Sequence, residues 1–157
     1  MKRMSLFIVF VLVFCLNIFA EEGQMAAGLG PEWNMNSREN FAGGIVLGFN
    51  YNLPIDIAQL TVGVNATIST NFSGYNVLEP AILIRWYFLG KDYMGFFAQA
   101  DLGVFLIIED GDTDSLFLGG LRGGFRMPLG SSLFIEPYGR IGYPFAFGVG
   151  AIAGIRF

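Results

Sequence analysis

The feature that most constrains this chain is a strict alternation of apolar and polar side chains, which is clearest between residues 78 and 88. In this stretch the even positions are all apolar, whereas Glu79, Arg85 and Tyr87 fall on odd positions. Successive side chains of a β-strand point to opposite faces, so the segment would present one apolar face and one polar face. It is therefore expected to be a strand that separates an apolar environment from a polar one.

The same alternation recurs in seven consecutive stretches after residue 40, and a further strand is expected before them. Hydrophobic residues make up 54% of the chain and charged residues only 14%, too few for the charged exterior of a soluble domain. The uncharged and largely apolar run 141–155 contains Pro144 and several glycines, so it does not suit a membrane-spanning helix. These features predict an all-β protein, an eight-stranded antiparallel transmembrane β-barrel. The expected strands are residues 24–30, 41–52, 57–69, 78–88, 94–108, 116–127, 133–143 and 147–157.

The first twenty residues have the layout of a cleavable signal peptide. Lys2 and Arg3 precede an apolar run over residues 6–19, and Ala20 is a small residue at the expected cleavage point. The run is about 14 residues long, shorter than the roughly 20 that a transmembrane helix needs. We therefore expect a signal peptide at residues 1–20 and one outer-membrane β-barrel domain at residues 21–157.

Charged side chains within the expected strands fall on the polar phase, which would point them into the barrel lumen. An arginine on the lipid face near the midplane would cost about 2–4 kcal/mol, so the inward phase is physically favoured. The expected lumen charge network consists of Glu79, Arg85, Asp101, Arg122, Arg126, Glu136 and Arg140. An eight-stranded barrel is just wide enough for side chains to fill. These groups would therefore form either a paired polar core or the lining of a narrow, anion-preferring channel.

The expected connections and the aromatic residues predict how the barrel is oriented in the membrane. The turns at residues 53–56, 89–93 and 128–132 are short, whereas those at 31–40, 70–76, 109–115 and 144–146 are mostly longer or more polar. Short turns are typical of the periplasmic side of such barrels, and longer loops of the outside. Aromatic girdles are expected at both ends: Tyr51, Trp86, Phe88, Phe96, Phe125 and Phe157 near the short turns, and Phe41, Phe117, Tyr143 and Phe147 near the loops.

Several functional classes are disfavoured by composition. The chain has no histidine, on which small outer-membrane enzymes rely, so we expect no catalytic residues and no enzymatic activity. Without Lys2 and Arg3, seven of the nine basic residues remain against 13 acidic ones, which argues against nucleic acid as a partner. The lone Cys15 lies in the expected signal peptide, so no disulfide is expected. The acidic segment 109–115 departs from the glycine and glutamate pattern of calcium loops, and we expect no metal site and no cofactor.

With these features the chain resembles the small eight-stranded outer-membrane β-barrels, namely the OmpA transmembrane-domain, OmpX and OmpW-like families. Its ending places apolar Ile155 two residues before the terminal Phe157, and it looks like the C-terminal signal that the outer-membrane assembly machinery reads. The resemblance implies a monomer in the outer membrane of a diderm bacterium. Outer-membrane lipids and the assembly machinery would be its partners, together with an extracellular ligand that the sequence does not identify.

Three functional interpretations are compatible with these patterns. The first is a non-enzymatic integral outer-membrane barrel with a structural or surface-interaction role and a charged, largely closed lumen. The second is a narrow, porin-like channel or conduit for ions or small hydrophobic compounds. The third is a helical inner-membrane protein that packs through the Gly-Ala-Ile-Ala-Gly segment at residues 150–154.

Overall fold

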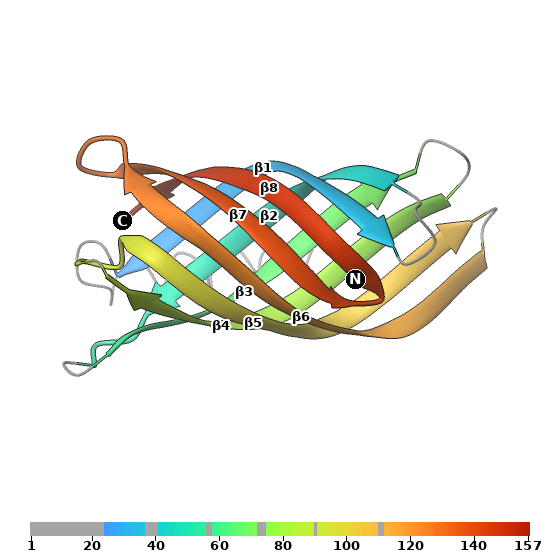
Figure 1. Cartoon of the computed structure of the whole chain (residues 1–157), viewed down its shortest axis with the longest axis horizontal. Coiled ribbons are helices and arrows are strands. Elements are labelled where there is room, and N and C mark those ends of the chain that lie inside the picture. The colour runs from blue at the N-terminus through green and yellow to red at the C-terminus, as the bar shows by residue number, and fades with distance from the viewer. Residues whose placement is uncertain (1–23, 37–40, 56–57, 72–74, 90, 110–111) are drawn as a thin grey trace, which may run out of the picture.

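The computed structural model describes residues 24–36, 41–55, 58–71, 75–89, 91–109 and 112–157, which form a closed β-barrel (Figure 1). These residues contain the strands β1 (Met25–Asn36), β2 (Phe41–Asn52), β3 (Gln59–Thr70), β4 (Tyr75–Phe88), β5 (Gly95–Glu109), β6 (Asp112–Pro128), β7 (Leu133–Tyr143) and β8 (Phe145–Arg156). Each strand pairs antiparallel with the next, and β1 pairs with β8. The predicted all-β, eight-stranded antiparallel barrel is therefore confirmed. The expected signal peptide, residues 1–20, lies outside the described residues.

The seam between β1 and β8 closes the barrel next to the end of the chain. The Met25 amide donates to the Phe157 carbonyl at 3.0 Å, and the Phe157 amide donates back to the Met25 carbonyl at 2.9 Å. The connections β2–β3, β4–β5 and β6–β7 lie at the same end of the barrel as Phe157 (Figure 1). We call this the turn end and the opposite one the loop end. Closure gives every strand a paired neighbour on both sides and leaves the sheet without an open edge strand, as hydrocarbon surroundings require.

Side-chain exposure follows the predicted alternation. On β4, Ile82 and Trp86 are exposed, whereas Leu83 and Arg85 are buried inside the barrel. The exposed outward side chains of the other strands are mostly large and apolar: Leu29, Ile45, Leu47, Val62, Val64, Leu102, Val104, Leu121, Ile141, Val149 and Ile155. The barrel thus has an apolar exterior and a polar interior.

The helical alternative is wrong, because residues 150–154 lie in the middle of β8. Among the described residues, no helix has the length and hydropathy to span a membrane. In β8 the small residues of this segment instead allow close approach to neighbouring strands. A Cβ atom at Gly154, for example, would lie 2.3 Å from the Phe134 ring and 2.4 Å from the Ala27 carbonyl oxygen.

The largest departure from the predicted strands is in β1. A strand over residues 24–30 followed by a polar loop over residues 31–40 was expected, but β1 continues to Asn36 and pairs with both β2 and β8 beyond Pro31. Glu32 and Asn34 are buried in the lumen, so polarity in this segment marks the inward face of a strand. The loop expected at residues 109–115 is likewise shorter, because β6 begins at Asp112.

Three strands contain a proline away from their ends, and the sheet accommodates each one in the same way. Pro31, Pro80 and Pro137 are exposed on the outer face of the barrel. Beside each proline the pairing is interrupted on one side only, against β8, β5 and β6 respectively. The register is the same before and after each interruption, so the strands are not bulged there. A missing ladder contact is what the lack of a proline N–H requires.

Candidate functional site in the barrel lumen

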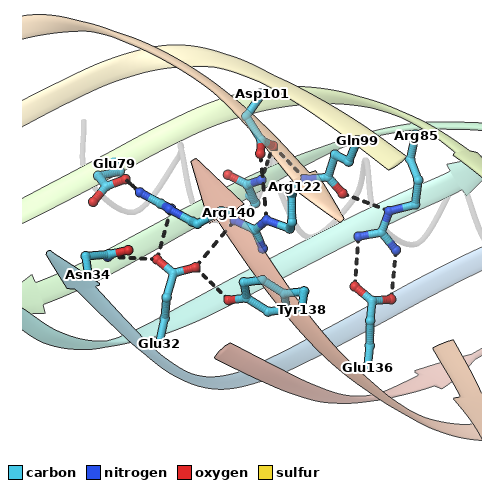
Figure 2. Close-up of polar contacts among 11 residues, drawn as sticks. Glu32, Asn34, Glu79, Arg85, Gln99, Asp101, Arg122, Glu136, Tyr138 and Arg140 are labelled. Atoms are coloured by element: carbon cyan, nitrogen blue, oxygen red, sulfur yellow. Dashed lines mark hydrogen bonds and ion pairs between the residues drawn. The ribbon is translucent and has the colours of Figure 1, made fainter. Parts of the chain in front are cut away.

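The inward side chains of the strands form a connected polar set inside the barrel (Figure 2). All seven residues of the predicted lumen charge network are buried there: Glu79, Arg85, Asp101, Arg122, Arg126, Glu136 and Arg140. Glu32 of β1, which the sequence analysis placed in a loop, joins them and is 0% exposed. Among the described residues the lumen therefore holds four arginines and four carboxylates, and their formal charges balance.

Strand register determines which of these charges become neighbours. Arg85 lies opposite Gln99 between β4 and β5, and Gln99 lies opposite Arg122 between β5 and β6. Arg122 in turn lies directly opposite Arg140 between β6 and β7. Like charges at directly opposed positions destabilise a sheet. The Glu32 carboxylate reaches across from β1 and contacts both arginines, which relieves this repulsion.

One group of charges lies toward the turn end, and we call it the turn-end cluster: Arg85, Arg126, Glu136 and Tyr87. Arg85 makes a bidentate contact with Glu136, with Nη1–Oε2 and Nη2–Oε1 distances of 2.8 Å. Arg126 Nε donates to the same carboxylate at 2.7 Å, and Arg85 Nη1 also donates to the Tyr87 hydroxyl at 2.9 Å. One carboxylate therefore serves two guanidinium groups.

The second group lies toward the loop end, and we call it the loop-end cluster: Glu32, Glu79, Asp101, Arg122, Arg140 and Tyr138. Arg140 bridges two carboxylates, Glu32 at 2.9 Å and Glu79 at 2.5 Å. The Tyr138 hydroxyl donates to Glu32 at 2.6 Å. The ion pairs of Arg122 are longer. Its Nη2 atom lies 3.5 Å from Glu32 Oε2, and its Nε atom lies 3.7 Å from Asp101 Oδ2. Three carboxylates thus share two guanidinium groups, so carboxylates are in excess here, whereas arginines are in excess in the turn-end cluster.

Gln99 joins the two clusters. Its side-chain oxygen accepts from Arg85 Nε at 2.7 Å, and its nitrogen donates to Asp101 at 2.6 Å (Figure 2). Asn65 donates to the same oxygen of Asp101 at 2.8 Å. A cavity of about 10 Å³, roughly the size of one water molecule, is lined by residues of both clusters and by Gln99.

Aromatic rings cover the guanidinium planes inside the barrel. The Arg85 guanidinium lies 4.0 Å from the centre of the Phe97 ring, and Arg126 lies 4.1 Å from Phe134. In the loop-end cluster Arg140 lies 3.5 Å from the Phe145 ring at the start of β8. Cation–π contacts of this kind strengthen when the cation is removed from water. They also fill the space that the polar side chains leave.

A signal in the sequence could have identified Glu32. The odd positions Leu29 and Trp33 are apolar and more than half exposed in the structure, whereas the even positions Glu32 and Asn34 are buried. The alternation of the later strands therefore already extends through this segment. Pro31 and the polar composition concealed it, because both are also typical of loops.

The C-terminal residues and the aromatic residues occupy the positions that the alternation predicts. Ile155 is exposed on the outer face, and the Phe157 ring lies 6.5 Å from that of Phe49. Near the turn end, Phe96 lies 6.4 Å from Phe88 and 4.7 Å from Phe125, centre to centre. Exposed rings near the loop end belong to Phe41, Phe117, Tyr143 and Phe147, and Trp33 adds one that the sequence analysis did not include.

Comparison with known proteins identifies the fold alone. No protein-family model and no curated protein matches the chain. The crystal structure of Neisserial surface protein A is similar with a TM-score of 0.60 and 12% identity, covering 84% of this chain and 94% of that one. The N-terminal β-barrel domain of Pseudomonas aeruginosa OprF gives 0.57 and 12% identity over 87% and 100% of the two chains. A de novo designed protein, TMB2.3, gives 0.52 and 14% identity over 88% and 98%.

These neighbours bear out the resemblance that the sequence pattern indicated. The chain has the fold of the small eight-stranded outer-membrane β-barrels. At 12–14% identity the likeness assigns no role to any side chain.

Proposed function

We propose that this chain is a non-enzymatic integral outer-membrane β-barrel with a structural or surface-interaction role and a charged, largely closed lumen. The observation that carries this proposal is the balanced set of four arginines and four carboxylates buried in the lumen. Four of their ion pairs measure between 2.5 and 2.9 Å. Since an eight-stranded barrel is just wide enough for side chains to fill, a paired set of this size favours a plugged interior.

The exterior supports residence in the outer membrane of a diderm bacterium, with its lipids as partners. Apolar side chains surround the barrel between two belts of aromatic rings. Aromatic belts are typical of the two membrane interfaces. The turn end would then face the periplasm and the loop end the outside.

Assembly and processing complete the proposal. Ile155 and Phe157 would be read by the outer-membrane assembly machinery, and residues 1–20 would be removed as a signal peptide. The backbone hydrogen bonds between Phe157 and Met25 would fix the closing seam once the signal has been used. The mature barrel would be a monomer. It would lack a catalytic site, because the sequence contains no histidine.

A narrow anion channel is the second candidate, and one observation favours it. Arg126 is 1% exposed, and its Nη1 atom makes no hydrogen bond with any described residue. The cavity lined by Arg85, Arg122 and Arg126 lies beside it. A conduit for hydrophobic compounds has less support, because the buried apolar side chains of the described residues form two separate clusters.

Reconstitution tests the leading proposal against the channel. The protein would be refolded into lipid vesicles, and its folded state would be checked by β-sheet circular dichroism and by faster gel mobility of unboiled samples. We expect chloride efflux from these vesicles to match that of protein-free vesicles. Efflux that rises with the amount of folded protein would favour the channel. Failure to insert at all would contradict the membrane assignment itself.

A further inference from the structure

Two glycines create the small cavity inside the barrel. Gly28 of β1 and Gly48 of β2 lie directly opposite each other across the sheet, and both line the cavity of about 10 Å³. A Cβ atom at Gly28 would lie 2.5 Å from Cγ2 of Ile152. A Cβ atom at Gly48 would meet no atom of the described residues within 4 Å, apart from its own neighbours in the chain. The open space therefore adjoins Gly48, and its volume suits one particle of the size of a water molecule.

Positive charge predominates in the wall of this cavity. Among the described residues, the ionisable side chains that line it are three arginines and one carboxylate: Arg85, Arg122, Arg126 and Glu136. Arg122 also lies 3.5 Å from Glu32 and 3.7 Å from Asp101, so the carboxylates of the loop-end cluster share its charge. Even without Arg122, two guanidinium groups face one carboxylate. The wall therefore carries at least one positive charge in excess.

Two of these guanidinium groups have a buried N–H without an acceptor. Arg126 Nη1 and Arg122 Nε make no hydrogen bond with any described residue, and the two side chains are only 1% and 3% exposed. A guanidinium group has five N–H donors and no acceptor atom of its own. A buried donor without an acceptor is destabilising. An acceptor in the cavity, which both arginines line, would remove this cost.

We infer that this cavity binds one small monatomic anion, a halide such as chloride. A halide accepts hydrogen bonds from several donors and also neutralises the excess positive charge of the buried arginines. A water molecule fits by size and accepts hydrogen bonds, but it brings no charge. Phosphate, sulfate and carboxylate ions bring charge, but they are too large for a cavity of this volume.

The remaining wall of the cavity favours an anion. Buried apolar side chains of Leu83, Phe134 and Ile152 line it, and electrostatic attraction is stronger in such surroundings than in water. Glu136 does not oppose the anion with a free oxygen, because Arg85 donates to both of its carboxylate oxygens and Arg126 donates to one of them. The bound ion would be a fixed counter-ion of the turn-end cluster. This inference rests on the proposed function in one respect, since the ion stays in place only if the lumen is largely closed.

Anomalous X-ray diffraction locates the ion directly. The refolded full-length barrel would be crystallised in sodium bromide, because bromide is a halide that scatters anomalously. We expect one anomalous peak in the lumen, within hydrogen-bond distance of Arg126 Nη1. Density at this place without an anomalous signal would identify a water molecule and overturn the inference. Bromide found only on the exposed surface would be an adventitious ion only, and it would overturn the inference as well.

Urea unfolding of the barrel in phosphatidylcholine vesicles tests binding in solution. Sodium chloride would be exchanged for sodium gluconate at constant ionic strength, because the gluconate ion is too large for the cavity. A ligand that binds only the folded state lowers the unfolding constant by the factor 1 + [ligand]/Kd. We therefore expect the unfolding constant to fall about tenfold for each tenfold rise in chloride concentration above Kd. Equal unfolding constants in the two salts would contradict chloride binding.

Gly48→Ala fills the cavity with a methyl group and leaves every arginine in place. We expect this variant to lose both the lumen bromide peak and the dependence of unfolding on chloride. The matched control is Gly123→Ala on the exposed outer face of β6, where the added Cβ atom would lie 3.9 Å from the Phe97 carbonyl oxygen. The control should keep both signals. A chloride dependence that survives in folded Gly48→Ala would overturn the inference.

Two controls keep this test separate from that of the proposed function. Circular dichroism and unboiled gel mobility would first establish that each sample is a folded barrel. If Gly48→Ala does not fold, the bromide experiment on the unmodified barrel decides alone. A cavity without bromide in a barrel that shows no chloride efflux would overturn the anion site and leave the closed lumen intact. Chloride efflux through the folded barrel would contradict the closed lumen, and a fixed counter-ion with it.

Discussion

The two charge clusters in the lumen both consist of arginines and carboxylates, but their excess charges have opposite signs. In the turn-end cluster two arginines share Glu136, with contacts of 2.7–2.8 Å. In the loop-end cluster three carboxylates share two arginines, and the contacts of Arg122 lengthen to 3.5 and 3.7 Å. The turn-end cluster therefore carries one excess positive charge and the loop-end cluster one excess negative charge. The lumen is neutral only as a whole.

We infer from this contrast that the length of an ion pair does not determine how much the pair stabilises the barrel. At the turn end each arginine contributes to an excess of positive charge although its ion pairs are short, whereas Arg122 at the loop end offsets an excess of negative charge although its ion pairs are long. Removing one partner of a buried pair is costly mainly because it leaves a buried charge without compensation. We therefore rank the effects of substitution by the charge that each one leaves behind.

The largest effect is expected for Glu136→Gln, which leaves both Arg85 and Arg126 without a carboxylate. Unfolding free energy should fall by about 3–5 kcal/mol, as for other uncompensated buried charges. The matched control is Glu79→Gln, because Arg140 keeps its contact with Glu32 at 2.9 Å, and its loss should be about 1–3 kcal/mol. Urea unfolding of the barrel in lipid vesicles measures both. Equal losses would show that the two clusters do not differ as described.

A comparison of Arg122→Met with Arg85→Met distinguishes the effect of charge compensation on stability from the effect of ion-pair distance. Arg122→Met leaves three carboxylates facing Arg140 alone, and we expect a loss of about 3–4 kcal/mol. Arg85→Met leaves Glu136 paired with Arg126 at 2.7 Å, and we expect a loss of about 1–3 kcal/mol despite the shorter contacts that it removes. The same urea titration ranks them. The reverse order would mean that the close bidentate contact outweighs charge compensation.

Gln99→Leu removes the side chain that joins the clusters. Two buried hydrogen bonds are lost and the volume is nearly kept, so a loss of about 1–2 kcal/mol is expected. Thr61→Val is the matched control, because it removes a lumen hydrogen bond to Asn52 of 2.8 Å outside both clusters. The loss of unfolding free energy for Thr61→Val should be about 1 kcal/mol.

Gln99 should also couple the two clusters energetically. The stability losses of Glu136→Gln and Glu79→Gln should become additive in the Gln99→Leu background, as a double-mutant cycle would show.

The smallest effect concerns Tyr93, which lies in the β4–β5 turn and donates to the Leu53 carbonyl at 2.5 Å. Burial, together with nearby Tyr51, raises the pKa of the Tyr93 phenol above its ordinary value. A raised pKa in the folded state means that this contribution is fully present below about pH 10 and is lost as pH rises further. Tyr93→Phe should therefore flatten the fall in melting temperature above about pH 10. An unchanged pH profile would contradict this role.

The alternation of side chains was sufficient to predict the barrel, its strand number and the inward side of seven charged residues. Between residues 78 and 88 of β4 the period of two is uninterrupted, so the phase of this strand followed directly from the sequence. The extent of strand β1 was harder to predict, because Pro31 and the polar residues after it are equally typical of a loop. The pairing of Glu32 with two arginines could not be predicted at all. It depends on the register that closes β1 onto β8, which no local pattern contains.

The projection of β6 beyond β7 was likewise absent from the sequence pattern. The β5–β6 ladder reaches Asp112, whereas the β6–β7 ladder ends at Gly119. The sequence analysis assigned residues 109–115 to an acidic loop, whereas the hairpin continues through most of them as paired strand. Whether a polar segment forms a loop or a projecting hairpin is decided by its neighbours across the sheet.

Single-channel conductance in planar bilayers is the most direct test of the central claim that the charge-balanced lumen is largely closed. The sample would be refolded protein whose unboiled gel mobility shows a compact barrel. We predict no steady openings from the folded barrel, because both clusters fill the lumen in series. Steady, discrete openings would contradict a closed lumen, and a preference for anions would then identify Arg85, Arg122, Arg126 and Arg140 as the lining of a channel.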